Sequence, residues 1–271
     1  MFKKEKTFQD SSGREIIENK KEELHWERED GSWIFGGKPV IATGIEPVVP
    51  LRFSLLKKLK HGKTILSIGC GLGAEMQPLT KDGFVTVGLD PERGFLKIGK
   101  TKESANSFIC AVGEAIPLCG CSFDVVLLFD VLEHVKNPDT VLEEIGRILK
   151  TKGILFVAVP NRFYLFETHG IQIYRKNVDN FLGIGIPFFS FAPDFLRKRL
   201  ERARIYTETE ILSLLKKHDF EPLIIECMMP TLDVRKQTAL TKALRNVFSS
   251  LGSVPIIKKC GPSIMVISQR I

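Results

Sequence analysis

Hydrophobic and polar positions alternate regularly between residues 63 and 160, where short apolar runs are separated by amphipathic stretches. Apolar runs bounded by glycine or polar residues predict strands, and apolar residues three or four positions apart predict helices. The predicted strands cover residues 63–68, 84–90, 107–112, 123–129 and 154–159, and the predicted helices cover 74–81, 91–100 and 137–150. This alternation indicates an α/β protein with a doubly wound, mostly parallel sheet.

The pattern breaks between residues 161 and 205 and then resumes. That segment is rich in Phe, Tyr and Arg and is much longer than an ordinary connection of about four to six residues, so we interpret it as an insertion. After it we expect a helix capped by Thr207 or Thr209, a strand, a further helix and a last strand. The last three expected elements cover residues 223–228, 236–251 and 263–268. Residues 1–45 are interpreted as an N-terminal extension, and 46–271 as the main domain.

A glycine-rich turn follows the first predicted strand and contains Gly69, Cys70, Gly71 and Gly73. Glycine lets the backbone pass where a Cβ would collide, and the helix that follows offers unpaired N–H groups to a ligand. Asp90 ends the next predicted strand, where a carboxylate can accept two hydrogen bonds from a ribose diol. Together these features predict a nucleoside-containing ligand at the carboxyl edge of the sheet. The turn also fits dinucleotide sites, so an oxidoreductase that binds NAD stays an alternative.

A second group of motifs indicates which nucleoside-containing ligand the chain binds. The segment SFDVVLLFDVLEHV starts at Ser122, and Pro138, Gly153 and the pair Pro160-Asn161 follow it. With the glycine turn, these motifs closely resemble the class I S-adenosylmethionine-dependent methyltransferases, in particular their broad small-molecule (type 11-like) subfamily. The resemblance covers about residues 64–161. It implies a Rossmann-like methyltransferase fold with a seven-stranded sheet whose last strand is antiparallel.

The resemblance also implies which residues bind S-adenosyl-L-methionine. The glycine turn would line the methionine and ribose parts, Asp90 would hold the ribose hydroxyls, and Glu114 would lie in the loop beside the adenine. Phe129 and Asp130 would lie beside the methionine end. The chain departs from the family twice: Ser67 stands where an acid is usual before the first glycine, and Val112 stands where the adenine loop usually carries an Asp.

Two histidines are candidate general bases for a hydroxyl acceptor. His169 lies at the start of the insertion, near Glu167, just beyond the fifth predicted strand; its alternative role is a polar loop cap. His134 lies in the DVLEHV segment, where its alternative role is a hydrogen-bonded structural histidine.

The insertion has its own candidate roles. Its many phenylalanines could form a lid over an aromatic or lipid-like acceptor, or a small satellite core. The basic run 195–204 could contact an anionic surface, or form a solvated helix face. Peripheral membrane contact is therefore one expectation for this segment.

Composition excludes several classes of protein. The chain has 271 residues, 44% hydrophobic residues and a net charge of +7, but its 39 basic and 32 acidic residues are interleaved. We expect no DNA partner, and the charge does not favour an RNA partner, because no aromatic–basic recognition motif accompanies it. The six cysteines lack zinc-ligand spacing, so we expect free thiols, no metal site and a cytoplasmic protein. No signal peptide or apolar span of about 18 residues is present, and nothing in the composition indicates an oligomeric state.

The function that these features predict is S-adenosylmethionine-dependent methyl transfer to an O, N or C atom of a small or amphipathic acceptor. Two alternatives remain beside the oxidoreductase: a catalytically silent methyltransferase-like binding protein, suggested by Ser67 and Val112, and an RNA methyltransferase, suggested by the basic excess.

Overall fold

The structure, a computed structural model, is described over most of the main domain and over parts of the segments around it. The described residues are 7–9, 15–17, 33–35, 38–40, 64–73, 75–102, 107–167, 171–173, 176–178, 186–228 and 259–271. The predicted helix at 236–251 lies outside these residues.

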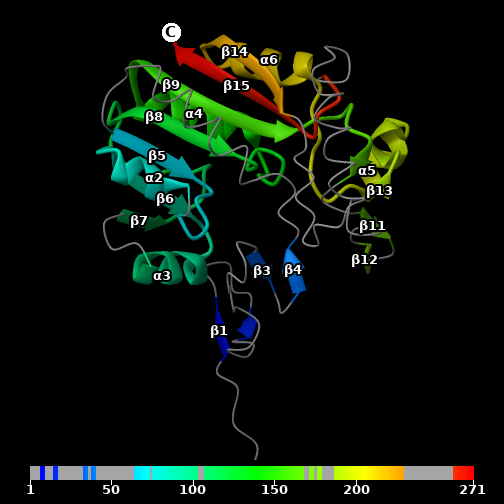
Figure 1. Ribbon diagram of the computed structural model, residues 1–271, viewed down its shortest axis with the longest axis horizontal. Coiled ribbons are helices and arrows are strands. Elements are labelled where there is room, and N and C mark those ends of the chain that lie inside the picture. Colours follow the sequence, from blue (N-terminus) through cyan, green and yellow to red (C-terminus); the bar gives the residue numbers. More distant parts are fainter. Residues whose placement is uncertain are drawn as a thin grey trace, which may run out of the picture.

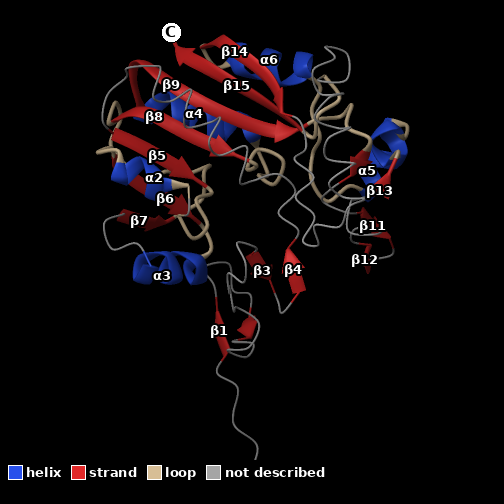
Figure 2. Ribbon diagram, in the orientation of Figure 1, coloured by secondary structure: helices blue, strands red, loops and turns tan. Residues whose placement is uncertain are grey.

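A seven-stranded sheet organises the described chain (Figure 1). Its strands are β5 (Thr64–Ile68), β6 (Val85–Asp90), β7 (Ser107–Cys110), β8 (Phe123–Phe129), β9 (Leu149–Pro160), β14 (Phe220–Met228) and β15 (Ser263–Arg270). They lie side by side in the order β14-β15-β9-β8-β5-β6-β7, which can be followed in Figure 2. Of these seven strands, only β15 runs against both of its neighbours, and the other pairs are parallel. The expected α/β sheet with an antiparallel last strand is confirmed.

The order of the strands creates a switch point beside β5. The chain first moves outward from β5 to β6 and β7, and then returns to the other side of β5 with β8. At such a point the connections after neighbouring strands leave in opposite directions, which opens a crevice at the carboxyl ends of the strands. The glycine turn follows β5, so it lies at this crevice.

Helices cover both faces of the sheet. They are α2 (Met76–Lys81), α3 (Arg93–Lys102), α4 (Pro138–Ile148) and α6 (Glu208–Lys217). A further helix, α5 (Asp194–Leu200), lies apart from the sheet, in the segment between β9 and α6 (Figure 1). Alternate residues of a strand point to opposite faces. Leu66 therefore packs in the core layer with residues of α4 and α6, while Ile65 packs in the other layer with Leu79 of α2.

Local capping explains where several helices start. Asn137 accepts hydrogen bonds from the backbone N–H groups of Asp139 and Thr140, and Pro138 occupies the first turn of α4. Thr207 and Glu210 form a reciprocal capping box at the start of α6. The helix expected from residue 91 starts at Arg93, because the Asp90 carboxylate accepts from the backbone N–H of Glu92 and holds this residue in a turn.

Short strands pair outside the main sheet. In the N-terminal segment, β1 (Thr7–Gln9) pairs with β2 (Glu15–Ile17), and β3 (Trp33–Phe35) pairs with β4 (Lys38–Val40). Between β9 and α6, β10 (Phe166–Glu167) pairs with β13 (Ile186–Pro187), and β11 (Ile171–Ile173) pairs with β12 (Lys176–Val178). A short 3-10 helix, η2 (Phe189–Phe191), leads into α5. No helix within the described residues has the length and apolar character to cross a membrane.

A carboxylate joins the amino ends of three central strands. Asp124 in β8 accepts from the backbone N–H and the hydroxyl of Thr64 in β5, at 3.1 and 2.6 Å, and from Lys150 Nζ in β9 at 2.8 Å. Partial burial alone would raise the pKa of Asp124, but the hydrogen bonds from Lys150 and Thr64 outweigh it and hold the pKa below its usual value.

We expect Asp124→Asn to lower the free energy of unfolding at pH 7 by about 1 kcal/mol, because the hydrogen bonds to a charged acceptor are weakened. A depressed pKa stabilises the fold above the unfolded pKa of about 4, and this stabilisation is lost as the pH falls through the folded pKa. The wild type should therefore lose more stability than the variant between neutral pH and about pH 3. Urea unfolding at both pH values measures the difference; parallel losses in the two proteins would contradict it.

Candidate functional site

The turn after β5 is held against β6 by backbone hydrogen bonds. The N–H groups of Gly69 and Cys70 both donate to the carbonyl oxygen of Leu89, at 2.7 and 3.2 Å. The N–H of Gly73 donates to the carbonyl oxygen of Cys70 at 2.8 Å. Gly69, Gly71 and Gly73 all have positive φ angles, of 68°, 51° and 77°, which side chains other than glycine rarely adopt.

Two of these glycines are required by close packing, and the third borders open space. A Cβ at Gly69 would lie 2.4 Å from Cγ2 of Val131, and a Cβ at Gly73 would lie 2.8 Å from the ring of Phe108. A Cβ at Gly71 would meet nothing within 4 Å. The middle of the turn therefore leaves room for a ligand close to the backbone.

Asp90 is buried at the end of β6 and is aimed at the glycine turn. One carboxylate oxygen accepts from the N–H of Gly71 and the other accepts from the N–H of Glu92, both at 2.8 Å. These bonds fix the orientation of the carboxylate. A carboxylate has about four acceptor positions, so Asp90 keeps capacity for two further donors.

A cavity of about 620 Å³ lies beside the turn, within the usual range of about 300–1,000 Å³ for small-molecule sites. Its wall is formed by the carboxyl ends of β5, β6 and β8 and by the loops that follow β7 and β8. The lining residues are Ile68, Gly69, Leu89, Asp90, Pro91, Val112, Gly113, Glu114, Asp130, Val131, His134, Val135 and Lys136.

The cavity and the turn fit a ligand with a nucleoside part. Asp90 offers the fixed acceptor that a ribose diol needs, and the space at Gly71 allows close approach to the backbone. Ile68, Leu89 and Val112 supply apolar wall on which a base can pack. At the position of Ser67 the chain is buried and offers a hydroxyl in place of a carboxylate.

The residues predicted from the sequence fall into four groups. Five line the cavity: Gly69, Asp90, Glu114, Asp130 and His134. Cys70, Gly71 and Gly73 belong to the adjoining turn, and the side chain of Phe129 packs in the core layer that faces α2. His169 lies outside the described residues.

The side chain of Cys70 points into the sheet. Its Sγ lies 2.6 Å from the position that a Cβ on Gly88 would occupy. Burial, together with the nearby charge of Asp90, raises the pKa of Cys70 to about 12. The group is a neutral thiol at physiological pH, so it offers no thiolate nucleophile.

His134 is exposed at the cavity wall, in the loop after β8. Its backbone N–H donates to the carbonyl oxygen of Val131 at 2.9 Å, which fixes the turn. Asp130 starts this loop with a positive φ of 55°, and its N–H donates to the carbonyl oxygen of Ala158 at 3.0 Å. A base and an acid therefore share one wall of the cavity.

Arg204 holds that loop from outside. Its guanidinium donates to the carbonyl oxygens of Val135 and Lys136, the second at 2.9 Å, and its backbone N–H donates to the carbonyl oxygen of Glu133 at 3.1 Å. Glu114 accepts from the N–H of Lys136 at 3.1 Å and holds the same loop from the other side.

Sequence reasoning missed Arg204 as well as Val131, Val135 and Lys136 in the wall. Val131 and Val135 are four positions apart directly after Asp130, and this spacing was the available signal. Arg204 had no local signal, because its partners are nearly 70 residues away in the sequence, at separations of 69 and 68.

We expect Arg204→Ala to weaken ligand binding in the cavity about five- to tenfold, because each lost hydrogen bond to the loop carries about 1 kcal/mol. Arg202→Ala is the matched control, since Arg202 is an exposed arginine two positions earlier. Titration calorimetry with S-adenosylhomocysteine measures the difference. Equal affinities of the two variants would show that the loop keeps its shape without Arg204.

The amino-acid sequence of this chain is similar to a known protein family and to several curated proteins. The family profile "Methyltransferase domain" matches residues 66–157, the segment that runs from β5 to β9. An uncharacterized protein of Methanocaldococcus jannaschii is 46% identical over 127 residues, which is 45% of this chain and 54% of that protein. The ubiquinone biosynthesis O-methyltransferase of Agrobacterium fabrum is 34% identical over 106 residues, 38% of this chain and 42% of that enzyme. The chain thus spans about half the length of these curated relatives.

Solved structures extend the similarity to the whole fold. A crystal structure of an S-adenosylmethionine-dependent methyltransferase from Mesorhizobium loti has a TM-score of 0.55 at 17% identity. The similar region covers 81% of this chain and 97% of that protein. At this identity the similarity establishes the fold.

Proposed function

We propose, from the premise that this chain carries a class I S-adenosylmethionine-dependent methyltransferase domain of the type 11-like family, that it transfers a methyl group to a small or amphipathic acceptor. The observation that carries the proposal is the single cavity in which the glycine turn, the end of β6 and the loop after β8 meet. We propose O-, N- or C-methylation, and the O-methyltransferase among the relatives favours oxygen.

We propose the following roles for the residues of this chain in binding and orienting the cofactor. Asp90 would hold the ribose hydroxyls, and the backbone of Gly69 to Gly73 would lie along the ribose and methionine parts. Glu114 would lie on the adenine side and Asp130 at the methionine end. When bound, S-adenosylmethionine supplies an electrophilic methyl group on a sulfonium.

For a hydroxyl acceptor, the chain must also take up a proton. His134 is in place at the cavity wall, and an imidazole is the side chain that most often serves as a general base. We propose His134 as the base, and His169 remains a second candidate from the sequence. The apolar wall around the site, which includes Val131 and Val135, excludes water from one side of the acceptor.

A catalytically silent binding protein is the second candidate function, because two features favour it. Ser67 gives no carboxylate for the ammonium group of a methionine moiety, and Val112 gives none for the adenine side. Such a protein would bind the cofactor weakly and would act through another surface.

Several wider assignments stay proposals. We propose residues 1–45 as an extension and 161–205 as an insertion of the domain at 46–271. We propose a cytoplasmic protein with a small-molecule or lipid-like substrate, without a DNA partner, that contacts membranes peripherally; RNA is the less favoured alternative substrate.

The deciding experiment incubates the purified full chain with methyl-labelled S-adenosylmethionine and a cell extract, and identifies the labelled product by mass. Label in a small molecule or lipid supports the proposal, and label in RNA supports the RNA alternative. Binding of S-adenosylhomocysteine without label transfer supports the silent protein. Stabilisation by NAD in a thermal-shift assay, without stabilisation by S-adenosylhomocysteine, would contradict the methyltransferase assignment.

A further inference from the structure

Helix α5 displays its apolar side chains and buries a charge. Phe195 is 80% exposed and Leu196 is 42% exposed, whereas Arg197, the next residue along the helix, is only 4% exposed. A helix on a protein surface normally turns its apolar stripe inward and its charges outward. Here the pattern is inverted, which indicates that the apolar face has a partner outside the described chain.

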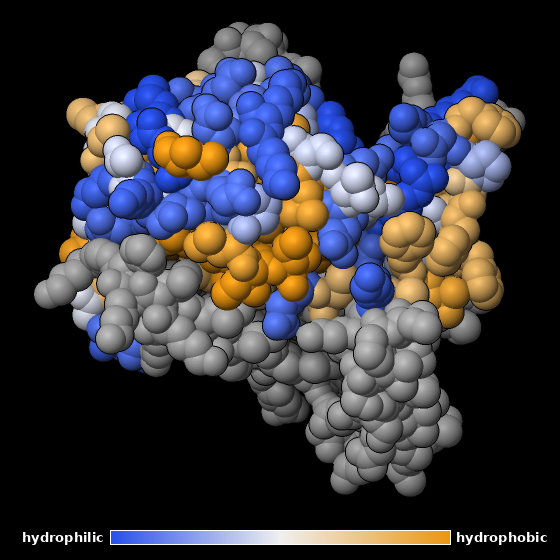
Figure 3. Space-filling model, turned by 90° about the horizontal axis from the view of Figure 1, so that it is seen from above, coloured by the Kyte–Doolittle hydropathy of each residue, from blue (hydrophilic) through white to orange (hydrophobic). Residues whose placement is uncertain are grey.

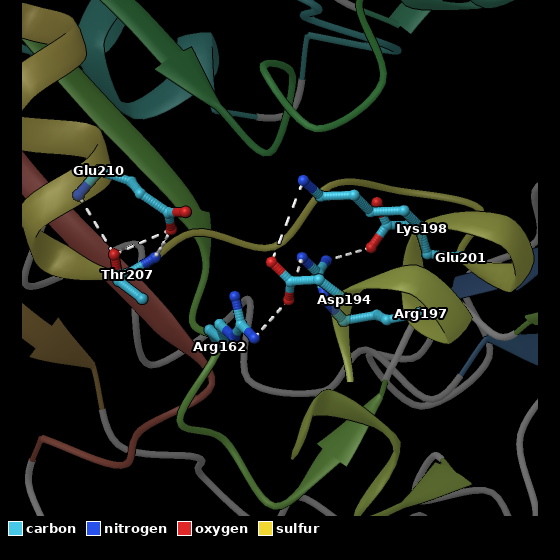
Figure 4. Close-up of polar contacts among 7 residues, drawn as sticks. All are labelled: Arg162, Asp194, Arg197, Lys198, Glu201, Thr207 and Glu210. Atoms are coloured by element: carbon cyan, nitrogen blue, oxygen red, sulfur yellow. Dashed lines mark hydrogen bonds and ion pairs between the residues drawn. The ribbon is translucent and has the colours of Figure 1, made fainter. Parts of the chain in front are cut away.

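Ion pairs hold α5 in this orientation (Figure 4). Asp194 accepts from Arg162, which follows β9, at 2.5 Å, and from Arg197 at 3.4 Å. Arg197 also pairs with Glu201 at the end of the helix. Turning Phe195 inward would carry Arg197 outward, break these pairs and leave the largely buried carboxylate of Glu201 without its cation, so the exposed face is the stable arrangement.

Further exposed apolar residues lie next to α5 along the chain. Phe188, which precedes η2, is 66% exposed, and Phe191, the last residue of η2, is 54% exposed; η2 leads into α5. The N–H of Phe188 donates to the carbonyl oxygen of Leu165, also an exposed residue, at 2.8 Å. We call these residues the apolar surface: Leu165, Phe188, Phe191, Phe195 and Leu196. Figure 3 shows apolar side chains gathered on this side of the molecule, beside hydrophilic ones.

One residue of the apolar surface, Phe188, has an unusual backbone conformation. Phe188 has a φ of 61°, in the left-handed region that a bulky residue rarely adopts. Non-glycine residues held in such conformations cluster at functional sites.

Cations accompany the apolar surface. Lys198 and Arg199 follow Phe195 by three and four positions, so they share its side of the helix, and both are exposed. Arg202, just beyond the helix, is exposed as well. Aromatic side chains next to lysine and arginine are typical of segments that lie in the interface of a bilayer with anionic lipids.

We propose that the apolar surface and the cations of α5 dock this protein onto an anionic lipid surface. The phenylalanines enter the boundary between headgroups and acyl chains, and Lys198, Arg199 and Arg202 meet lipid phosphates. A second copy of this chain is a less suitable partner for this face. A symmetric contact would bring the same cations of the two chains together, and they would repel each other. The docking requires neither cofactor nor acceptor, so its test is independent of methyl transfer.

The test measures cosedimentation of the full chain with vesicles of phosphatidylcholine alone and of phosphatidylcholine with about 30% phosphatidylglycerol. We expect at least about tenfold tighter binding to the anionic vesicles, and we expect salt to weaken it. Phe191→Ser/Phe195→Ser should reduce the affinity about tenfold, because less apolar area enters the interface. Lys198→Gln/Arg199→Gln should reduce it by at least about tenfold and remove most of the salt dependence.

Matched variants on remote surfaces control for non-specific effects of exposed apolar area and of net charge on vesicle binding. Val85→Ser removes an exposed apolar residue at the start of β6, and Lys97→Gln/Lys100→Gln removes two exposed cations of α3. Both should bind like the wild type, and circular dichroism should show all variants folded. Absence of binding to anionic vesicles, or equal losses in test and control variants, would overturn the proposal. Self-association that the phenylalanine variants abolish, without vesicle binding, would also overturn it and identify a dimer face.

Discussion

Asp90→Ala should weaken the binding of S-adenosylhomocysteine by about 100-fold or more. The carboxylate is buried at the end of β6 and is already oriented by the N–H groups of Gly71 and Glu92. Hydrogen bonds to a charged acceptor contribute about 1.5–3 kcal/mol each, and the alanine removes the two that a ribose diol would make. A loss of about 3 kcal/mol corresponds to roughly a 100-fold change in the dissociation constant.

The control for Asp90→Ala is a second acid that lies away from the cavity. Asp82 is exposed at the end of α2, and Asp82→Ala should bind like the wild type. Since Asp90→Ala also leaves two N–H groups without their acceptor, its thermal unfolding must be measured before its affinity. Asp90→Asn keeps the shape of the side chain and one carbonyl oxygen. Its affinity for S-adenosylhomocysteine should fall between that of Asp90→Ala and that of Asp82→Ala. Wild-type affinity of a well-folded Asp90→Ala protein would refute the role of this carboxylate.

Substitution of two neighbouring glycines should separate folding from binding. Both Gly69 and Gly71 have positive φ angles, so alanine at either position costs about 1–2 kcal/mol in the backbone. At Gly69 the new Cβ would also lie 2.4 Å from the side chain of Val131, and such overpacking adds about 1–3 kcal/mol. At Gly71 the Cβ meets nothing and enters the open space of the turn.

We therefore expect Gly69→Ala to lose about 2–5 kcal/mol of stability, and Gly71→Ala to remain folded. Gly71→Ala should nevertheless bind S-adenosylhomocysteine at least about tenfold more weakly, because the methyl group occupies space that the ligand needs. Urea unfolding and calorimetry on both variants measure the two effects. A Gly71→Ala protein with unchanged affinity would place the ligand elsewhere in the cavity.

Most of the main sheet was predictable because its signals are local. The run from Phe123 to Phe129 is apolar on both faces, as a central strand must be, and it forms β8 with these bounds. Where bounds differed, the cause was pairing that the apolar pattern does not contain. Strand β9 begins at Leu149 and not at residue 154, since Leu149, directly after α4, pairs with Phe123 at the start of β8 before a shift in register.

The candidate site was predictable only in part. The glycine turn and Asp90 are adjacent in the fold because both follow neighbouring parallel strands, and the sequence gives that order. The packing of Phe129 in the core layer, away from the cavity wall, depends on which face of β8 it occupies at the end of the strand. That orientation is fixed by the sheet as a whole.

The sequence by itself determined the order of strands and helices, the position of the glycine turn and the acid at the end of β6. These depend on periodicity and on conformations that few residue types adopt, and both are properties of short segments. Only the tertiary structure decided the walls of the cavity, the attachment of its loop by Arg204 and the outward face of α5. These depend on contacts between residues far apart in the chain, such as Arg204 with Val135 and Arg162 with Asp194, whose energies no local pattern records.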